Sequence, residues 1–256
     1  MINAWGITDK GAVRQQNQDG YYLQRYDSDL AVGVVCDGMG GARAGNVASL
    51  LAVETFSDIL DSLRKAAPED AALLLREAAE AANSAVYQRA CADPDCRGMG
   101  TTMVAALVSG KTAHLLNIGD SRAYHVGETG ISKLTRDHSV VEDMVLRGEL
   151  SPEEARNHPR KNLITRALGS EPHVRADLYE KELVQGEYLL LCSDGLSNVV
   201  TDQEMLYEIL HGGPAEDCCQ RLMDIAVDNL EKFLAGKPQN VVNNYRCSIG
   251  NPVRGY

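Results

Sequence analysis

Three apolar stretches of the sequence each end in an aspartate beside a glycine. The three aspartates are Asp37, Asp120 and Asp194. A short run of apolar residues is typical of a buried strand, so each carboxylate is expected where a strand leaves the core. One Asp-Gly pair alone is better explained by an ordinary turn. Three of them, each after an apolar stretch, favour one shared cluster of carboxylates.

Such a cluster has the ligand chemistry of a hard metal ion. Asp19 offers a further carboxylate, and no cysteine or histidine has the spacing of a zinc site. Carboxylate and carbonyl oxygens suit Mg²⁺ or Mn²⁺. Two such ions close together can bind a phosphate and lower the pKa of a bridging water, which then attacks phosphorus. The residues therefore indicate metal-assisted phosphate chemistry that needs no serine or cysteine nucleophile.

Arg14 precedes Asp19 within a polar stretch of the chain. A guanidinium binds phosphate oxygens through two parallel hydrogen bonds, which makes Arg14 a candidate phosphate ligand. The alternative is a surface arginine in a polar loop, and the local sequence alone favours that alternative.

Hydrophobic spacing predicts the elements that position these residues. Helices are expected to begin at the capping residues Asn46, Ser151 and Thr201. Strands adjacent in sequence alternate with pairs of helices, which favours an α+β architecture in one domain. The expected strands cover residues 3–13, 30–37, 101–108, 112–120, 123–126, 131–134, 176–184 and 187–192, and the expected helices cover residues 46–65, 69–89, 140–147, 151–155, 202–210 and 215–233.

Composition narrows the class of protein. The 256 residues carry a formal net charge of −11, which disfavours binding to nucleic acid or to an anionic membrane. The seven cysteines are odd in number and form no disulfide framework, as in proteins of reducing compartments. The chain has no signal-peptide pattern at its start and no apolar run of about 18 residues. We therefore expect a cytoplasmic protein.

Seven short motifs occur along the chain, and they begin at Arg14, Val35, Gly100, Asn117, Leu134, Ile164 and Leu191. In this order they resemble the motifs of the metal-dependent serine/threonine phosphatases of the protein phosphatase 2C family, bacterial type. The resemblance extends from about residue 3 to about residue 228 and implies a central β-sandwich of two antiparallel sheets flanked by α-helices, a four-layer αββα arrangement.

The resemblance also implies metal ligands. Asp37 would bridge two core ions, Mn²⁺ or Mg²⁺, and Gly38 would offer its backbone carbonyl to one of them. Asp194 would bind the other ion, and Asp19 would act through bound water. Asp120 matches the position associated with a third, weaker ion.

Further roles follow from the same resemblance. Arg14 would hold the substrate phosphate, and residues 140–165 match a flap beside the site that can tune substrate choice. Met39 stands where animal members carry a histidine proposed as general acid. A bound water or another group would therefore protonate the leaving oxygen in this chain.

The C-terminal end departs from the family pattern. The family ends with a glycine pair, an Asp-Asn pair whose aspartate is a core metal ligand, and a last apolar strand. Asp228 and Asn229 copy the dipeptide, but they fall early, inside a helical pattern and without the glycine pair. No ligand role is assigned to Asp228. We expect a catalytic domain over residues 1–228 and a divergent or out-of-frame tail over residues 229–256.

The expected function is hydrolysis of phosphoserine and phosphothreonine in proteins, in opposition to a bacterial serine/threonine kinase. One alternative is a phosphatase-like module that binds phosphorylated partners with little or no turnover, which the altered C-terminus would favour. Another is a phosphatase that acts on a small regulatory protein in a partner switch, and the sequence does not distinguish it from the first.

Overall fold

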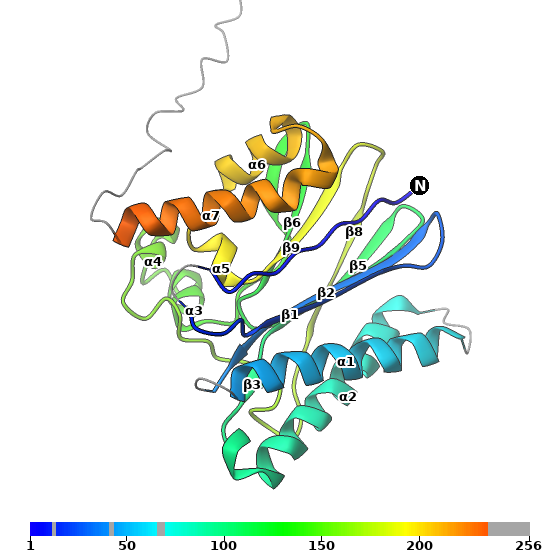
Figure 1. Cartoon of the computed structure of the whole chain (residues 1–256), viewed down its shortest axis with the longest axis vertical. Helices are drawn as coiled ribbons and strands as arrows, with labels where there is room; N and C mark the ends of the chain where they lie inside the picture. The colour runs from blue at the N-terminus through cyan, green and yellow to red at the C-terminus, as the bar shows by residue number, and fades with distance from the viewer. Residues whose placement is uncertain (12–13, 41–43, 66–69, 235–256) are drawn as a thin grey trace, which may run out of the picture.

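Two antiparallel sheets pack face to face, and a pair of helices covers the outer side of each (Figure 1). The computed structural model describes residues 1–11, 14–40, 44–65 and 70–234. Separate hydrophobic clusters fill the space between the two sheets and the space under each helix pair. The predicted α+β sandwich of four layers is therefore confirmed.

The first sheet supplies two of the candidate aspartates. Strand β1 begins at Asp19, which lies directly opposite Asp37 in the β1–β2 register. Cross-strand neighbours of this kind have side chains within reach of each other. The order of the sheet is β1 (Asp19–Arg25), β2 (Leu30–Met39), β4 (Met103–Ser109), β5 (Thr112–Ile118) and β8 (Asp177–Glu182), with β3 (Gly100–Thr101) paired to the end of β2.

The second sheet is smaller than the first and has three strands in the described part of the chain. Its order is β7 (Gly130–Lys133), β6 (Arg122–Gly127) and β9 (Tyr188–Cys192). Within the described residues, β9 pairs with β6 alone, so the backbone groups on its other edge have no partner strand.

The strand predicted over residues 3–13 is wrong for the part that the structure describes, since residues 3–11 have no strand ladder. The segment is instead held by single contacts on two sides. Tyr21 on β1 donates a hydrogen bond to the Gly6 carbonyl, and the thiol of Cys219 donates to the carbonyl of Trp5. A strand needs a neighbour that offers a row of backbone groups, and no described strand does so here. Residues 12–13 lie outside the described part of the chain.

The helices begin at capping residues that the sequence identified in part. Thr201 forms the predicted capping box, and Ser151 is a cap as predicted and forms a capping box as well. Asn46 is not a cap, because the first helix already begins two residues earlier. The long helices are α1 (Ala44–Lys65), α2 (Ala71–Ala92), α6 (Asp202–His211) and α7 (Cys218–Leu234), and the short ones are η1 (Pro94–Cys96), α3 (Val140–Leu146), α4 (Pro152–Arg156), α5 (Asp194–Ser197) and η2 (Ala215–Asp217).

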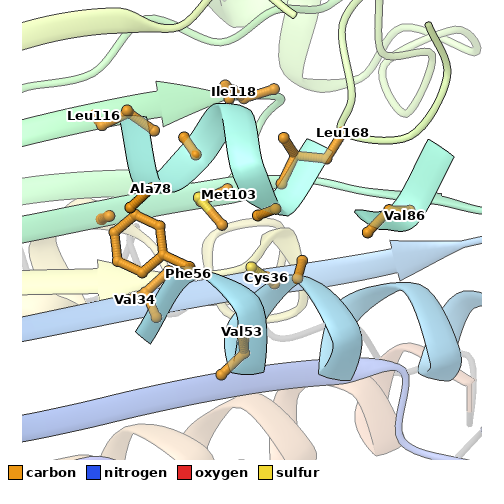
Figure 2. Packing of buried hydrophobic residues seen from close by; sticks show 14 of the residues in the cluster. Val34, Cys36, Val53, Phe56, Ala78, Val86, Met103, Leu116, Ile118 and Leu168 are labelled. Carbon is orange, nitrogen blue, oxygen red and sulfur yellow. The ribbon is translucent and has the colours of Figure 1, made fainter. Parts of the chain in front are cut away.

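The core under α1 and α2 fixes the direction of the Asp37 side chain. Val34 and Cys36 on β2 are buried against Phe56 of α1 (Figure 2). Side chains alternate along a strand, so Val35 and Asp37 point to the opposite face, toward the second sheet. Burial of a side chain such as Phe56 contributes about 1.5 to 3 kcal/mol. Apolar packing on one face of β2 therefore directs a carboxylate to the other.

Candidate metal centre

The structure brings Asp19, Asp37, Asp120 and Asp194 together at one end of the sandwich. Asp19 and Asp37 face each other across β1 and β2, and Asp120 follows β5 in the same sheet. Asp194 comes from the second sheet, as the first residue of α5 directly after β9. The negative charges of the other three residues all act on Asp37. The strand ends that the sequence singled out thus meet at one place.

Crowding of these carboxylates perturbs their protonation. Burial raises the pKa of Asp37 to about 9, and the charges of Asp19 and Asp194 add to the effect. Burial also raises the pKa of Asp120 to about 7, with the charge of Asp194 contributing next. The pKa of Asp19 is raised by burial as well, against the effect of a hydrogen bond from Ser193. The cluster holds more negative charge than its surroundings neutralise.

A divalent cation would supply the missing positive charge. Within the described residues, no three side chains of His, Cys, Asp or Glu lie close enough to hold a metal by themselves. The carboxylates instead approach one another in pairs around Asp37. Mg²⁺ and similar hard ions are usually held by one or two carboxylates and keep several waters, so this oxygen-only donor set fits them.

Thr102 connects the strand that carries Asp37 to the loop that carries Asp120. Its hydroxyl oxygen accepts a hydrogen bond from the Asp37 backbone N–H at 2.9 Å, and its own N–H donates to the Asp37 carbonyl at 2.9 Å. The same hydroxyl lies 2.7 Å from the hydroxyl of Ser121. These bonds fix the relative positions of two predicted ligands.

Ser193 supports a second pair of ligands. It precedes Asp194, and its hydroxyl donates to a carboxylate oxygen of Asp19 at 2.7 Å. The sequence analysis assigned no role to Ser193 or Thr102. Both residues lie inside the matched motifs. Ser193 stands next to the predicted ligand Asp194, and Thr102 follows the pair Gly100-Thr101, and these neighbours are the signal by which the sequence could have indicated them.

Gly38 has no room for a side chain. A Cβ at this position would lie 1.9 Å from the backbone oxygen of Gly45, in the first turn of α1. The Gly38 N–H also donates to the Gln18 carbonyl at 3.0 Å. The residue after Asp37 is therefore a point where three backbone segments meet.

Arg14 is exposed at the edge of the cluster. Its positive charge lowers the pKa of Asp19, and its Nη1 donates to the side-chain oxygen of Gln18 at 3.3 Å. This hydrogen bond lies at the surface of the protein.

Asp228 lies on α7 with its side chain 57% exposed and forms an ion pair with Lys232. This exposed position is consistent with the expectation that Asp228 is not a metal ligand. Asn229 donates to the Val199 carbonyl at 3.0 Å and so attaches α7 to the segment after α5. The expected domain boundary at residue 228 falls within α7, and residues 235–256 of the expected tail lie outside the described part of the chain.

The predicted flap, residues 140–165, is an excursion closed at its base. It contains α3 and α4, and a β-bridge joins Ser139 to Ile164. The N–H of Val140 also donates to the Leu163 carbonyl at 2.9 Å. The two ends of the excursion are thereby held together.

Comparison with known proteins identifies the class to which this fold and site belong. The family model described as protein phosphatase 2C matches residues 10–235. The chain is 39% identical over 199 residues to the serine/threonine phosphatase stp of Listeria welshimeri, which covers 77% of this chain and 79% of that protein. It is 36% identical over 234 residues to the phosphatase PstP of Mycobacterium tuberculosis, a match that covers 91% of this chain and 42% of PstP.

Comparison with solved structures leads to the same class of protein. The structure of the serine/threonine phosphatase Stp1 from Staphylococcus aureus matches with a TM-score of 0.80 and 38% identity, over 88% of this chain and 89% of that one. The catalytic domain of PstP in complex with two manganese ions matches with a TM-score of 0.74 and 35% identity, over 86% of this chain and 89% of that one.

The chain belongs to the protein phosphatase 2C family. This membership confirms the predicted class of enzyme, a phosphoprotein phosphatase of bacterial type. The comparisons give no support to the alternative, a phosphatase-like module without turnover.

Proposed function

We propose that this chain removes phosphate from phosphoserine and phosphothreonine side chains of proteins with the help of Mn²⁺ or Mg²⁺. The observation that carries the proposal is the convergence of four aspartates from both sheets, with the pKa of Asp37 raised to about 9. The relatives are named serine/threonine phosphatases, and the matched PstP domain binds two manganese ions.

Asp37 is the residue best placed to serve two ions, because Asp19 lies opposite it in the strand register and the charge of Asp194 acts on it as well. Asp194 and the Gly38 carbonyl would complete the two core sites, Asp19 would act through water, and Asp120 would bind a third ion. When bound, the cations supply the charge that activates a water as the nucleophile. Ser193 orients Asp19 in this scheme, because its hydroxyl donates a hydrogen bond to the Asp19 carboxylate.

Arg14 would bind the substrate phosphate at the edge of the cluster. A guanidinium pairs with two phosphate oxygens at once and holds the phosphorus in line with the attacking water. Met39 at the end of β2 has no proton to give. A bound water or another group would therefore protonate the oxygen of the departing serine or threonine.

The remaining parts of the proposal concern the protein partners and the cellular location. Phosphorylated proteins are the substrates, a serine/threonine kinase is the opposing enzyme, and the flap over residues 140–165 would contribute to substrate choice. We propose a cytoplasmic location. Across the described ranges, every helix is too short or too polar to cross a bilayer.

The direct test is phosphate release from a phosphothreonine peptide by the full chain, with Mn²⁺ or Mg²⁺ and then with excess chelator. Asp37→Asn is the test variant, and Asp58→Asn on the exposed side of α1 is its matched control. We expect metal-dependent release that the first change abolishes and the second leaves intact. A folded chain that binds Mn²⁺ but releases no phosphate would overturn the proposal.

A further inference from the structure

His138 bonds both backbone groups of Gly119, the residue directly before Asp120. The N–H of Gly119 donates to Nδ1 of the His138 ring at 2.9 Å, and the Gly119 carbonyl accepts from the His138 backbone N–H at 2.9 Å. The ring is buried, with the residue 6% exposed. Gly119 has a φ of +106°, a conformation that favours glycine, so this turn depends on contacts that hold it in place.

The remaining ring nitrogen is held by Asp177 of β8. Because Nδ1 accepts a hydrogen bond, the proton of the neutral ring is on Nε2, which donates to Asp177 at 3.1 Å. Arg166 lies 2.9 Å from Nε2 and donates to the other Asp177 oxygen at 2.8 Å. Burial lowers the pKa of His138, which keeps the ring neutral. The carboxylate thus selects the tautomer that can accept from Gly119.

The opposite side of the Gly119 turn rests on Thr102. A Cβ on Gly119 would lie 2.6 Å from the Thr102 side chain, which is the group that also binds the backbone of Asp37. The Asp120 loop is therefore enclosed between His138 and Thr102. Displacement of the ring would release the loop on one side while the Asp37 strand stayed in place.

We propose that His138, oriented by Asp177, is a positioning residue that sets the Asp120 carboxylate for metal binding. It acts through the Gly119 peptide and touches neither phosphate nor metal. The inference rests on the proposed role of Asp120. Its chemistry resembles that of other outer-shell groups, whose loss typically lowers metal affinity or activity by about 10- to 100-fold.

The same residue is bonded to the end of the flap. The His138 carbonyl accepts a hydrogen bond from the Thr165 N–H at 2.8 Å. The flap and the Asp120 loop therefore share one anchor, and a change at His138 should affect metal binding even when no substrate is present.

Two substitutions separate the two ring nitrogens. His138→Asn places an amide oxygen near the position of Nδ1 and keeps an acceptor for Gly119, whereas His138→Gln keeps a donor toward Asp177 and loses that acceptor. Asp177→Asn is a second route, because an amide can donate to Nε2 and so favour the wrong tautomer. His114→Gln is the matched control, since His114 faces Glu180 between the same two strands, β5 and β8, away from the turn.

The readout is Mn²⁺ binding to the substrate-free full chain by isothermal titration calorimetry, with Asp120→Asn as reference. We expect the Asp120→Asn variant to lose the weakest binding event. His138→Gln and Asp177→Asn should weaken that same event by about 10-fold or more, while His138→Asn and His114→Gln stay close to wild type.

Wild-type Mn²⁺ affinity in both His138→Gln and Asp177→Asn would overturn the inference, as would equal losses in His138→Asn and His138→Gln. The same holds if Asp120→Asn binds every ion as the wild type does. Phosphate release by the wild-type chain is scored separately. An active wild type with unaltered variants refutes only the role of His138, whereas an inactive wild type refutes the proposed function.

Discussion

At the scale of the residue, the buried Asp37 carboxylate lowers the free energy of unfolding of the metal-free chain, because it lies among other carboxylates. Its pKa is about 9 in the folded chain and 3.8 by default, so folding near neutral pH requires a proton to be taken up. This penalty is absent below about pH 4, where the carboxyl is neutral in both states, and it grows as pH rises toward 9.

Asp37→Asn should therefore stabilise the chain in the presence of chelator while it abolishes activity. Relief of even about 1 to 2 kcal/mol raises the melting temperature by roughly 2 to 8 °C in a protein of this size. Thermal unfolding in chelator at pH 8 and at pH 4 measures the effect, which should vanish at the lower pH. A variant that melts below wild type at pH 8 would contradict this account.

Mn²⁺ affinity should rise with pH for the same reason. Asp37 and Asp120 must lose their protons to bind a cation, and burial raises their pKa values to about 9 and about 7. Each proton released strengthens binding by up to about 10-fold per pH unit below the pKa of its group. Calorimetry at pH 6.5 and 8.5, in buffers of different ionisation enthalpy, counts the protons. Affinity that does not change between these pH values would be inconsistent with the raised pKa values.

The sequence identified Asp37, Asp120 and Asp194 because each follows an apolar stretch, a local signal, whereas Asp19 lies in a polar stretch and was added as a further carboxylate. It did not identify Ser193, Thr102 or His138 as supports, because their partners are distant in the chain. Thr102 and Asp37 are 65 positions apart, and Ser193 and Asp19 are 174 apart. The first pair follows from strand pairing within the first sheet, and the second from how the two sheets stack.

At the scale of the element, the contact between β2 and α1 depends on two glycines. A methyl group on Gly38 would lie 1.9 Å from the Gly45 oxygen, which is backbone and has no freedom to rotate away. On Gly33 of the same strand, a methyl group would meet only the side chains of Leu23 and Leu191, at 3.5 and 3.9 Å.

Gly38→Ala should therefore destabilise the fold by about 1 to 3 kcal/mol and impair metal binding, since α1 or β2 must shift. Gly33→Ala, its matched control, should change stability by no more than about 0.5 kcal/mol. Urea unfolding of both variants makes the comparison. Equal stability of the two would mean that the close approach of β2 to α1 is unimportant.

The helices and strands were predicted correctly where residues close in sequence determine them, and incorrectly where packing against a distant segment determines them. Thr201 is followed three positions later by a glutamate, and the capping box forms. Asn46 is a good capping residue by type, but α1 begins at Ala44, because the backbone of Gly45 packs against Gly38. The strand expected over residues 3–13 has a suitable pattern but lacks a partner ladder.

At the scale of the whole molecule, the catalytic unit is expected to function without the last 22 residues. The family match extends to residue 235, and the four clustered aspartates all precede α7. A variant that ends at Leu234 should keep its Mn²⁺-dependent phosphate release and its melting temperature. Loss of one Mn²⁺ binding event in that variant would instead show that the removed residues supply a ligand.

The contact between the N-terminal segment and α7 gives the chain an optical probe. Trp5 is the only tryptophan in the sequence, it is 41% exposed, and its carbonyl accepts from the Cys219 thiol. Fluorescence excited at the red edge of the protein's absorption therefore comes from one position, between the first strand of one sheet and a helix that covers the other. A change in the emission maximum of Trp5 would report when the N-terminal segment separates from α7, without any attached dye.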